Sequence, residues 1–289
     1  MLTRRSLLGL ALGAALAASD AQAARGTSAL RKIHKRIGGR MGVHILDTQS
    51  GRRITLDDDS RYAMASTFKV ALAASLLWQV DHGAFPLTHQ LPIDKQDLVP
   101  HSPILEKAVE TGVTALDVRD LCGAAVSFSD NAAANVLLAG IGGPAAFTQF
   151  MRTIGDEVTR LDRIEPDLNS NLPGDERDTT TPRAMVETML RLFTQDVLSL
   201  ASRALLIEWM MGARNGTDRV RKGLPRSWQT GDKPGTGGNN AFNDLVITWP
   251  LGRRPILAAV YMSESNREHA ELAAAQAEIG QLIGREKWK

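Results

Sequence analysis

Two serine-containing segments stand just before helical runs. Ser66 precedes TFKVALAASLLWQV, and Lys69 lies one turn further along on the same helix face. A helix N-terminus favours negative charge, which assists a serine oxygen as a nucleophile, and a desolvated lysine can take up its proton. The alternative interpretation of the same spacing is that Ser66 only caps the helix and that Lys69 is exposed to solvent. In the second segment, Ser129, Asp130 and Asn131 precede AAANVLL, and any of the three could cap that helix.

A long polar segment, residues 163–182, carries prolines and a glycine and is predicted to form a compact surface loop. Glu165 and Asn169 lie four residues apart within it. A carboxylate and an amide that converge in this way could hold and deprotonate a water molecule. Arg163 and Asp178 lie near the two ends of the loop and could clamp its neck as an ion pair.

Lys233 begins the sequence KPGTGG, which leads into apolar, strand-forming residues. A phosphate-binding P-loop has its glycines before the lysine and a Ser or Thr directly after it. Here a proline follows the lysine and the glycines come later, so a P-loop is excluded. A lysine that enters a strand would instead present a positive wall to a substrate carboxylate.

The elements that must position these residues follow a regular order along the chain. Leu30, Ile33 and Ile37 recur at helical spacing, and two strands follow, MGVHILDT and RRITL. Residues 66–211 have mostly helical pattern with loops between. Three more strands, WQTGDK, FNDLVITW and PILAAVYMS, precede a last amphipathic helix, REHAELAAAQAEIGQLIG. We therefore predict a mixed α/β (α+β) fold, in which strands from both chain ends form one antiparallel sheet flanked by the terminal helices.

Two lobes are expected after a short leader. Residues 24–63 plus 212–289 would form the α/β lobe, and residues 64–211, with the omega-type loop 163–178, an inserted all-helical lobe. A ligand cleft is expected between them.

Residues 1–23 have the basic start, apolar run and Ala-Gln-Ala ending of an export signal. Their Arg-Arg pair resembles a twin-arginine signal, with an ordinary secretory signal as the alternative.

The composition excludes several function classes. A net charge of +2 over 289 residues makes nucleic acid a poor partner. No segment after the leader approaches the ~18 apolar residues of a membrane span. Cys122 is the single cysteine and is expected to be buried, so no intrachain disulfide can form. The six histidines show no metal-ligand spacing, and we predict neither a metal nor a cofactor.

Taken in this order, SxxK at Ser66, SDN at Ser129, ExxLN at Glu165 and KxG at Lys233 resemble the motif set of the class A serine β-lactamases. The resemblance extends over nearly the whole mature chain and includes LCGAAVSFSDN and RDTTTP. It implies the fold shared by serine β-lactamases and penicillin-binding proteins. It also implies a periplasmic monomer that hydrolyses penicillins and cephalosporins and so confers resistance to them.

The resemblance assigns the bond-making steps to a few residues. Ser66 would attack the β-lactam carbonyl and become acylated. The backbone N–H groups of Ser66 and Thr236 would hold the oxyanion, and Gly235 completes the KxG strand beside the substrate. Either Lys69, or Glu165 acting through a water, would be the base of the acylation step.

Further roles carry over from the same motifs. Ser129 would relay a proton to the departing lactam nitrogen, with Lys69 and Lys233 setting its electrostatics. Glu165 and Asn169 would position the water that hydrolyses the acyl-enzyme. Asn131 would bind the amide of the substrate's side chain.

Three positions depart from the usual family pattern. His101 stands where many members carry an aromatic gatekeeper. Arg219 matches a position from which some members supply a guanidinium that is missing from its usual place here. Pro234 replaces the Ser or Thr that normally follows the lysine. If the Thr236 N–H stays free for an oxyanion, the amide of residue 234 lies on the same open strand edge, where proline is tolerated.

Two alternative functions share part of the motif set. A penicillin-binding D-Ala-D-Ala peptidase would have the Ser-Lys, SxN and KxG elements, but it lacks the loop that carries Glu165 and Asn169. A non-hydrolysing β-lactam sensor would be acylated without turnover. The intact Glu165 argues against such a sensor, while Pro234 argues mildly for it.

Overall fold

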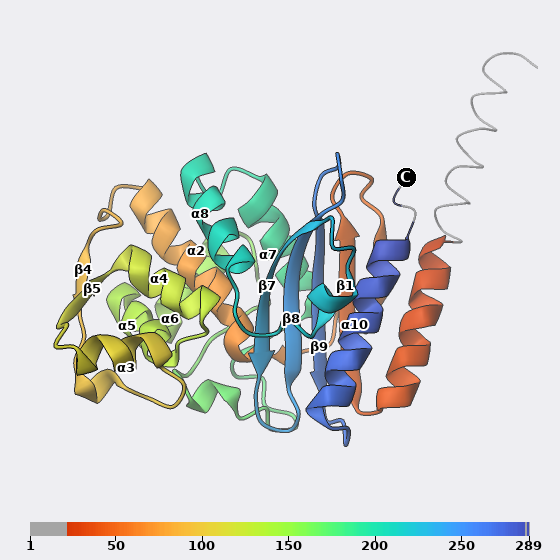
Figure 1. The fold of residues 1–289 in the computed structure, drawn as a ribbon, viewed down its shortest axis with the longest axis horizontal. Coiled ribbons are helices and arrows are strands. Elements are labelled where there is room, and N and C mark those ends of the chain that lie inside the picture. The colour runs from red at the N-terminus through yellow and green to blue at the C-terminus, as the bar shows by residue number, and fades with distance from the viewer. Residues whose placement is uncertain (1–21, 287, 289) are drawn as a thin grey trace, which may run out of the picture.

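The computed structural model describes residues 22–286 and 288. The leader predicted over residues 1–23 therefore lies almost entirely outside the described residues. Figure 1 shows a sheet with helices beside it at one end of the molecule and a group of helices at the other. The fold class predicted from the sequence is confirmed.

Five antiparallel strands in the order β2-β1-β9-β8-β7 form the main sheet. Their bounds are Arg40–Asp47 for β1, Arg53–Leu56 for β2, Gln229–Thr236 for β7, Phe242–Trp249 for β8 and Ile256–Ser263 for β9. β1 pairs along its whole length with β9, so that Val43 lies opposite Val260. Strands from both ends of the chain thus share one sheet, and β7 is left at its edge.

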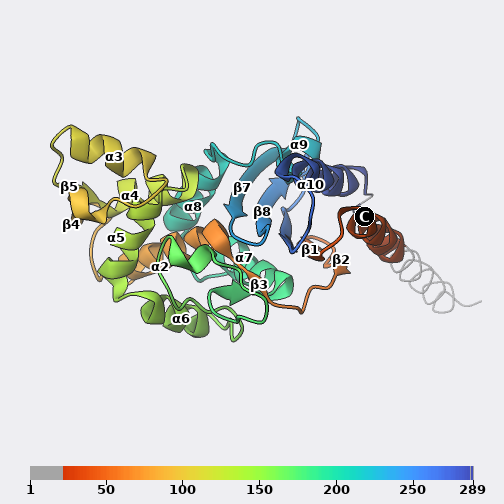
Figure 2. The same cartoon turned by 90° about the horizontal axis from the view of Figure 1, so that it is seen from below.

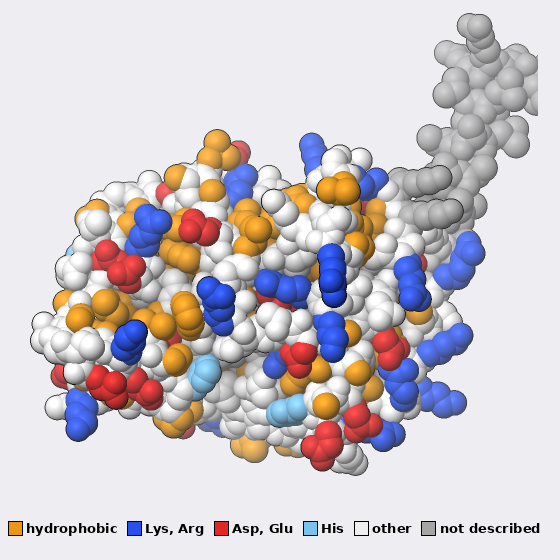
Figure 3. Space-filling model, in the orientation of Figure 1, with side chains coloured by type: hydrophobic (Ala, Val, Ile, Leu, Met, Phe, Trp, Pro, Cys, Tyr) orange, Lys and Arg blue, Asp and Glu red, His pale blue; other side chains and the backbone are white. Residues whose placement is uncertain are grey.

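Two terminal helices cover one face of this sheet (Figure 2). They are the helix of residues 22–37 and α10, which spans His269–Arg285. Leu30, Ile33 and Ile37 are buried in one core with the β1 and β9 side chains of that face. The opposite side of the first helix carries exposed Lys and Arg, and Figure 3 shows basic side chains gathered on this end of the molecule. The helices are amphipathic because they pack on the sheet with one face only.

The other face of the sheet packs against the helical lobe. Its helices are α2 (Phe68–Asp81), α3 (Pro103–Glu110), α4 (Val118–Ser127), α5 (Asn131–Ile141), α6 (Pro144–Thr153), α7 (Pro182–Thr194) and α8 (Leu200–Met211). A short helix, α9 (Val220–Gly223), packs against α10. α2 contacts α4, α5, α6 and α8, and its residues from Phe68 to Leu77 are all buried. Small alanine side chains let these neighbouring helices approach a helix that has no exposed face over most of its length.

Four short strands lie just before or within the helical block, and the sequence pattern did not predict them. β3 (Tyr62–Ala63) pairs with β6 (Thr179–Thr180), and β4 (Gln90–Pro92) pairs with β5 (Ala115–Asp117). Strands of two or three residues are too short to show an alternating pattern. The β3–β6 pair matters for the site, because it joins the segment before Ser66 to the end of the polar loop.

His44 lies buried on β1 in a small polar cluster. Its Nδ1 is 2.8 Å from Asp58 Oδ2, and Arg183 Nη2 lies 3.0 Å from the same carboxylate oxygen. The other ring nitrogen, Nε2, is buried without a hydrogen-bond partner among the described residues. Burial lowers the pKa of His44, and the hydrogen bond to Asp58 opposes this shift only in part.

His44 should therefore make the protein less stable in mild acid. Below a pH of about 6.5 the unfolded chain binds a proton at this histidine more readily than the folded chain does, so the free energy of unfolding falls as the pH decreases. The limit for one proton is about 1.4 kcal/mol per pH unit. Urea unfolding between pH 7.5 and 5.5 should show a smaller decrease for His44→Phe than for the unaltered chain. His89→Gln, at an exposed position, is the matched control, and an unchanged pH slope in His44→Phe would contradict the prediction.

Candidate active site

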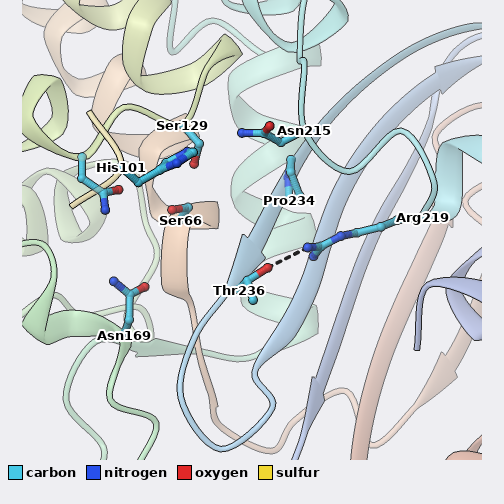
Figure 4. A pocket seen from close by; sticks show the side chains of 9 residues that line it. Ser66, His101, Ser129, Asn169, Asn215, Arg219, Pro234 and Thr236 are labelled. Carbon is cyan, nitrogen blue, oxygen red and sulfur yellow. Dashed lines mark hydrogen bonds between the residues drawn. The ribbon is translucent and has the colours of Figure 1, made fainter. Parts of the chain in front are cut away.

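A cavity of about 300 Å³ opens between the helical lobe and the edge strand β7. Residues from the helical segments and from β7 line it, as Figure 4 shows. They are Ser66, His101, Ser129, Asn131, Asn169, Asn215, Arg219, Pro234 and Thr236. Seven of these nine were singled out in the sequence as site residues, and Pro234 was noted as a departure from the family pattern. The remaining one is Asn215.

Ser66 lies in a single 3₁₀ turn, Ala65–Thr67, that leads directly into α2. Its Oγ is 3.1 Å from Lys69 Nζ, one turn further along. The lysine is completely buried, and its Nζ also lies 2.9 Å from the Ser129 carbonyl oxygen and 3.0 Å from Glu165 Oε1. Burial lowers the pKa of Lys69, and the charge of Glu165 opposes this shift. The amine therefore joins a serine hydroxyl to a carboxylate inside a desolvated site.

Ser129, between α4 and α5, and Lys233, on β7, meet in the site. Lys233 Nζ donates to Ser129 Oγ at 2.9 Å and to the Pro234 carbonyl oxygen at 2.9 Å. Like Lys69, this lysine is completely buried. Burial lowers its pKa well below the usual value, and the nearby positive charges of Lys69 and Arg219 lower it further. Two buried amines thus bracket the Ser129 residue, which lies in a left-handed conformation with a φ of 59°.

Glu165 and Asn169 lie together in the polar loop, where Asn169 is the last residue of a short 3₁₀ turn that spans Asp167–Asn169 and Glu165 precedes this turn. Asn169 Nδ2 donates to Glu165 Oε2 at 2.5 Å, while Asn169 Oδ1 is buried without a partner among the described residues. The Glu165–Pro166 peptide bond is cis. Asn135 on α5 holds the backbone of Glu165 at both ends, because its amide accepts from the Glu165 N–H and donates to the Glu165 carbonyl oxygen, both at 2.9 Å.

The two ends of the polar loop are joined by Arg163 and Asp178. The guanidinium Nε donates to Asp178 Oδ2 at 2.6 Å. The other carboxylate oxygen accepts the backbone N–H groups of Asp162 and Arg163 at 2.7 and 2.9 Å. Asp178 is completely buried, so these bonds replace the water that its charge would otherwise bind.

β7 presents the open edge of the sheet to the cavity. The turn that connects β7 to β8 begins with a hydrogen bond from the Gly237 N–H to the Ala241 carbonyl oxygen at 2.9 Å. In an antiparallel pair, residues that are hydrogen-bonded to the partner strand alternate with residues that are not. Because Gly237 is hydrogen-bonded to Ala241, the backbone nitrogens of Pro234 and Thr236 point away from β8. Proline at 234 therefore removes no bond of the ladder. Gly235 is required for another reason, since a Cβ there would lie 2.9 Å from the Met64 carbonyl oxygen in the segment that carries Ser66.

Arg219 enters the site from the segment between α8 and β7. Its Nη1 donates to the Gly235 and Asn243 carbonyl oxygens at 2.8 and 2.6 Å, and its Nη2 donates to Thr236 Oγ1 at 2.7 Å. The guanidinium also lies 3.7 Å from the centroid of the Phe242 ring. Arg219 is therefore held in place by the protein itself, and it orients the Thr236 hydroxyl (Figure 4).

Asn131 and His101 form the helical side of the cavity. Asn131 Nδ2 donates to the Pro100 carbonyl oxygen at 2.8 Å, and its Oδ1 accepts a hydrogen bond from Lys69. The Asn131 N–H donates to the His101 carbonyl oxygen at 3.0 Å, and His101 adopts a positive φ of 65°. The His101 side chain is exposed at the rim of the cavity.

Two residues of the site were missed by sequence reasoning. Asn135 follows the SDN motif by one helical turn, which places it on the same face of α5 as Asn131 and could have drawn attention to it. Asn215 lies in a short polar stretch, ARNGTDR, and carries no local signal of a role. In the described part of the chain, no helix is long and apolar enough to cross a membrane. Cys122 is buried, as expected.

Comparison with known proteins gives this arrangement a family. The model of the beta-lactamase enzyme family matches residues 26–286. The chain is 41% identical to β-lactamase L2 of Stenotrophomonas maltophilia over 273 residues, which cover 94% of this chain and 89% of that protein. The chain belongs to the class A β-lactamase family. The identification from the sequence motifs is thereby confirmed, and the protein is a serine hydrolase of the kind that opens β-lactams through an acyl-enzyme.

Other β-lactamases are similar to this one in sequence and in structure. It is 43% identical over 249 residues to the carbapenem-hydrolysing β-lactamase KPC of Klebsiella oxytoca, covering 85% of this chain and 84% of that one. A solved ancestral class A β-lactamase superposes with a TM-score of 0.87 at 49% identity, covering 89% of this chain and 98% of that chain. A β-lactamase from Xanthomonas campestris superposes with a TM-score of 0.88 at 41% identity, covering 91% and 97%.

Proposed function

We propose that this β-lactamase hydrolyses the lactam amide of penicillins and cephalosporins through an acyl-enzyme on Ser66 and a water activated by Glu165. The observation that carries the proposal is the position of Lys69, whose Nζ lies 3.1 Å from Ser66 Oγ and 3.0 Å from Glu165 Oε1. This buried chain of polar groups connects the nucleophile to the carboxylate that the second half of the reaction needs.

Acylation begins with the Ser66 hydroxyl. The Lys69–Glu165 pair accepts its proton as Oγ attacks the lactam carbonyl carbon. The oxyanion lies between the backbone N–H groups of Ser66 and Thr236, and the open edge of β7 supports this role for Thr236. Ser129 then delivers a proton to the lactam nitrogen as the C–N bond breaks, and Lys69 passes to Ser129 the proton that was taken from Ser66, while Lys233 stays protonated beside the Ser129 hydroxyl.

Deacylation uses the polar loop. Glu165 takes a proton from a water that also donates to Asn169 Oδ1, the buried acceptor that has no partner among the described residues. The hydroxide attacks the acyl carbonyl carbon, the ester bond breaks, and the proton returns to Ser66 Oγ. The fixed backbone of Glu165, held by Asn135 and by the Arg163–Asp178 pair at the neck, supports this role because the attacking water must be placed within a fraction of an ångström.

Substrate binding involves the other residues that line the cavity. Lys233 attracts the carboxylate of the substrate, and Arg219 acts by orienting Thr236. Asn131 binds the amide of the substrate's side chain, and His101 contacts that side chain at the rim; their positions in the cavity lining support both roles. Gly235 lets β7 approach Ser66 closely enough for these contacts to act on one molecule.

An assay with a chromogenic cephalosporin tests the function. The purified protein should turn over many equivalents, while intact-mass measurement during the reaction should show a transient adduct of substrate mass. A stoichiometric adduct without turnover would favour a β-lactam sensor. Turnover of D-Ala-D-Ala peptides in place of the cephalosporin would favour a peptidase.

Export and assembly belong to the same proposal. Class A β-lactamases are typically periplasmic or secreted. We infer that this one is exported to the periplasm by the twin-arginine route, that the mature chain starts near Ala24, and that it works as a monomer. Its two lobes correspond to residues 24–63 plus 212–289 and residues 64–211. Replacing the Arg-Arg pair of the leader by Lys-Lys should abolish export of active enzyme in cells, whereas a Sec-exported precursor would tolerate the change.

Pro234→Ser should raise kcat/KM for penicillins. Proline lacks the hydroxyl that could donate to the substrate carboxylate, and one hydrogen bond to a charged group contributes about 1.5–3 kcal/mol, which corresponds to about tenfold or more in kcat/KM. The residue lines the cavity on an edge strand, so the substitution restores an N–H that points to the open side and breaks no ladder bond. Steady-state kinetics on benzylpenicillin provide the measurement. An unchanged or lower kcat/KM would mean that other donors already satisfy the carboxylate.

A further inference from the structure

The carboxylate end of the cavity has fewer donors than its charged residues suggest. Lys233 Nζ donates two of its three protons to protein acceptors, Ser129 Oγ and the Pro234 carbonyl oxygen. Arg219 donates hydrogen bonds from Nη1 to two carbonyl oxygens and from Nη2 to the Thr236 hydroxyl. Pro234 has neither a hydroxyl nor an N–H. A substrate carboxylate therefore meets a wall in which most of the cationic N–H groups already have protein partners.

Thr236 remains a donor because of the way Arg219 holds it. Its Oγ1 accepts the guanidinium N–H at 2.7 Å, so the hydroxyl proton is free to be donated into the cavity. No other side chain bonded to Arg219 faces the substrate among the described residues. One hydroxyl is a small complement for a carboxylate, which has two oxygens and about four acceptor sites.

Asn215 stands at this end of the cavity, together with Ser129 and Pro234 (Figure 4). Its Nδ2 donates one proton to the Phe128 carbonyl oxygen at 3.2 Å. The second amide proton has no partner in the part of the chain that the structure describes. Because the Phe128 contact lies next to Ser129 in the chain, the amide nitrogen is held on the side of the cavity where the lysine and the serine hydroxyl meet.

The segment that carries Asn215 packs directly against Pro234. Gly216 adopts a positive φ of 75°, and a Cβ there would lie 2.7 Å from the Cβ of Pro234. The backbone of residue 216 therefore rests directly on the proline ring, which only glycine permits. Backbone hydrogen bonds fix the same segment at both sides, from Arg214 N–H to the Ser127 carbonyl oxygen and from Arg219 N–H to the Gly216 carbonyl oxygen, both at 2.9 Å.

We propose that Asn215 is a substrate-binding residue of this β-lactamase, whose carboxamide N–H donates to the substrate carboxylate in place of the hydroxyl that Pro234 lacks. This assignment rests on the proposed function, in which a β-lactam carboxylate occupies this end of the cavity. The Asn215 amide then compensates for the hydroxyl that Pro234 lacks. The two residues are linked structurally, because Gly216, the neighbour of Asn215, packs on the Pro234 ring.

Kinetics on a penicillin and on its methyl ester test the proposal. Asn215→Ala should lower kcat/KM for the free acid by about tenfold, the value of one hydrogen bond to a charged group, mainly through a higher KM. It should leave kcat/KM for the ester within twofold of the unaltered chain. Asn215→Asp should lose more on the free acid than Asn215→Ala does, because it places a like charge beside the carboxylate, and it should recover on the ester. Thr217→Ala, at an exposed position in the same segment, is the matched control and should change neither rate.

The pairing with Pro234 is measured in a double-mutant cycle. Pro234→Ser should increase kcat/KM for the free acid more strongly in the Asn215→Ala background than in the unaltered chain, because the new hydroxyl then fills the site that the amide left. Equal losses on acid and ester in Asn215→Ala would mean that the residue only supports the loop and would overturn the proposal. So would an unchanged kcat/KM for the acid, or equal gains from Pro234→Ser in both backgrounds. A lack of turnover in the unaltered protein would instead contradict the proposed hydrolysis, and the assignment of Asn215 with it.

Discussion

Glu165→Gln is expected to convert this β-lactamase into a protein that accumulates its acyl-enzyme. Glutamine keeps the shape of the side chain and can still accept the hydrogen bond from Asn169, but it cannot take a proton from the attacking water. Loss of a general base typically costs about 10²- to 10⁴-fold in rate, and here the loss should fall on deacylation. The adduct on Ser66 should therefore persist for minutes or longer after mixing with a penicillin.

Intact-mass measurement gives the decisive readout for this variant. A mass increase of one substrate molecule should appear quickly and decay slowly, whereas the unaltered chain should show only a transient adduct. Asp167→Asn removes an exposed carboxylate two residues further along the same loop and should keep normal turnover. Fast turnover in Glu165→Gln would remove Glu165 from its proposed role. A failure to form any adduct would instead show that acylation itself requires the carboxylate, through its 3.0 Å contact with Lys69.

The second large effect is expected from Arg163→Ala. This change leaves the completely buried Asp178 carboxylate without its positive partner, although two backbone N–H groups still donate to it. Removing one member of a buried ion pair costs about 3–5 kcal/mol, and the remaining donors place this case near the lower figure. A loss of about 3 kcal/mol corresponds to a decrease in melting temperature of roughly 10 °C. Because the same loop carries Glu165, deacylation should slow as well.

Thermal unfolding and pre-steady-state kinetics on the same variant measure these two consequences. Arg177→Ala is the matched control, since it removes an exposed guanidinium from the same loop, where it pairs with Asp175. It should leave both the melting temperature and the deacylation rate unchanged. A melting temperature within about 2 °C of the unaltered chain in Arg163→Ala would show that solvent or the backbone N–H groups already stabilise Asp178 sufficiently.

Many of the site residues could be predicted from the sequence because the residues that act together lie only three or four positions apart. Ser66 and Lys69 are one helical turn apart, and helical geometry alone places both on one face. Glu165 and Asn169 lie in one loop, and the loop is recognisable from its prolines and polar residues. The apolar period of residues 30–37 and of α10 predicted helices that pack with one face, because a helix at the surface must show that period. The order of strands along the chain predicted a sheet joined from both ends.

Contacts between segments far apart in the chain could be decided only by the tertiary structure. The hydrogen bond between Lys233 and Ser129 joins β7 to the segment between α4 and α5, and neither residue carries a local sign of the other. β7 lies at the edge of the sheet because it pairs only with β8, and β9, β1 and β2 follow on the far side of β8. The tolerance of Pro234 therefore depends on the strand order. Asn135 and Asn215 gain their places through backbone partners elsewhere in the chain.

The sequence by itself therefore determined which kinds of group act in this β-lactamase and which local elements carry them. The tertiary structure decided which of their protons and lone pairs remain free for a substrate. The physical reason is that a hydrogen-bond donor is available only if no other acceptor has claimed it, and the competing acceptors come from the whole fold. Arg219 illustrates this, because its charge was evident from the sequence, but its bonds to the protein leave Thr236 as the group that it presents to the cavity.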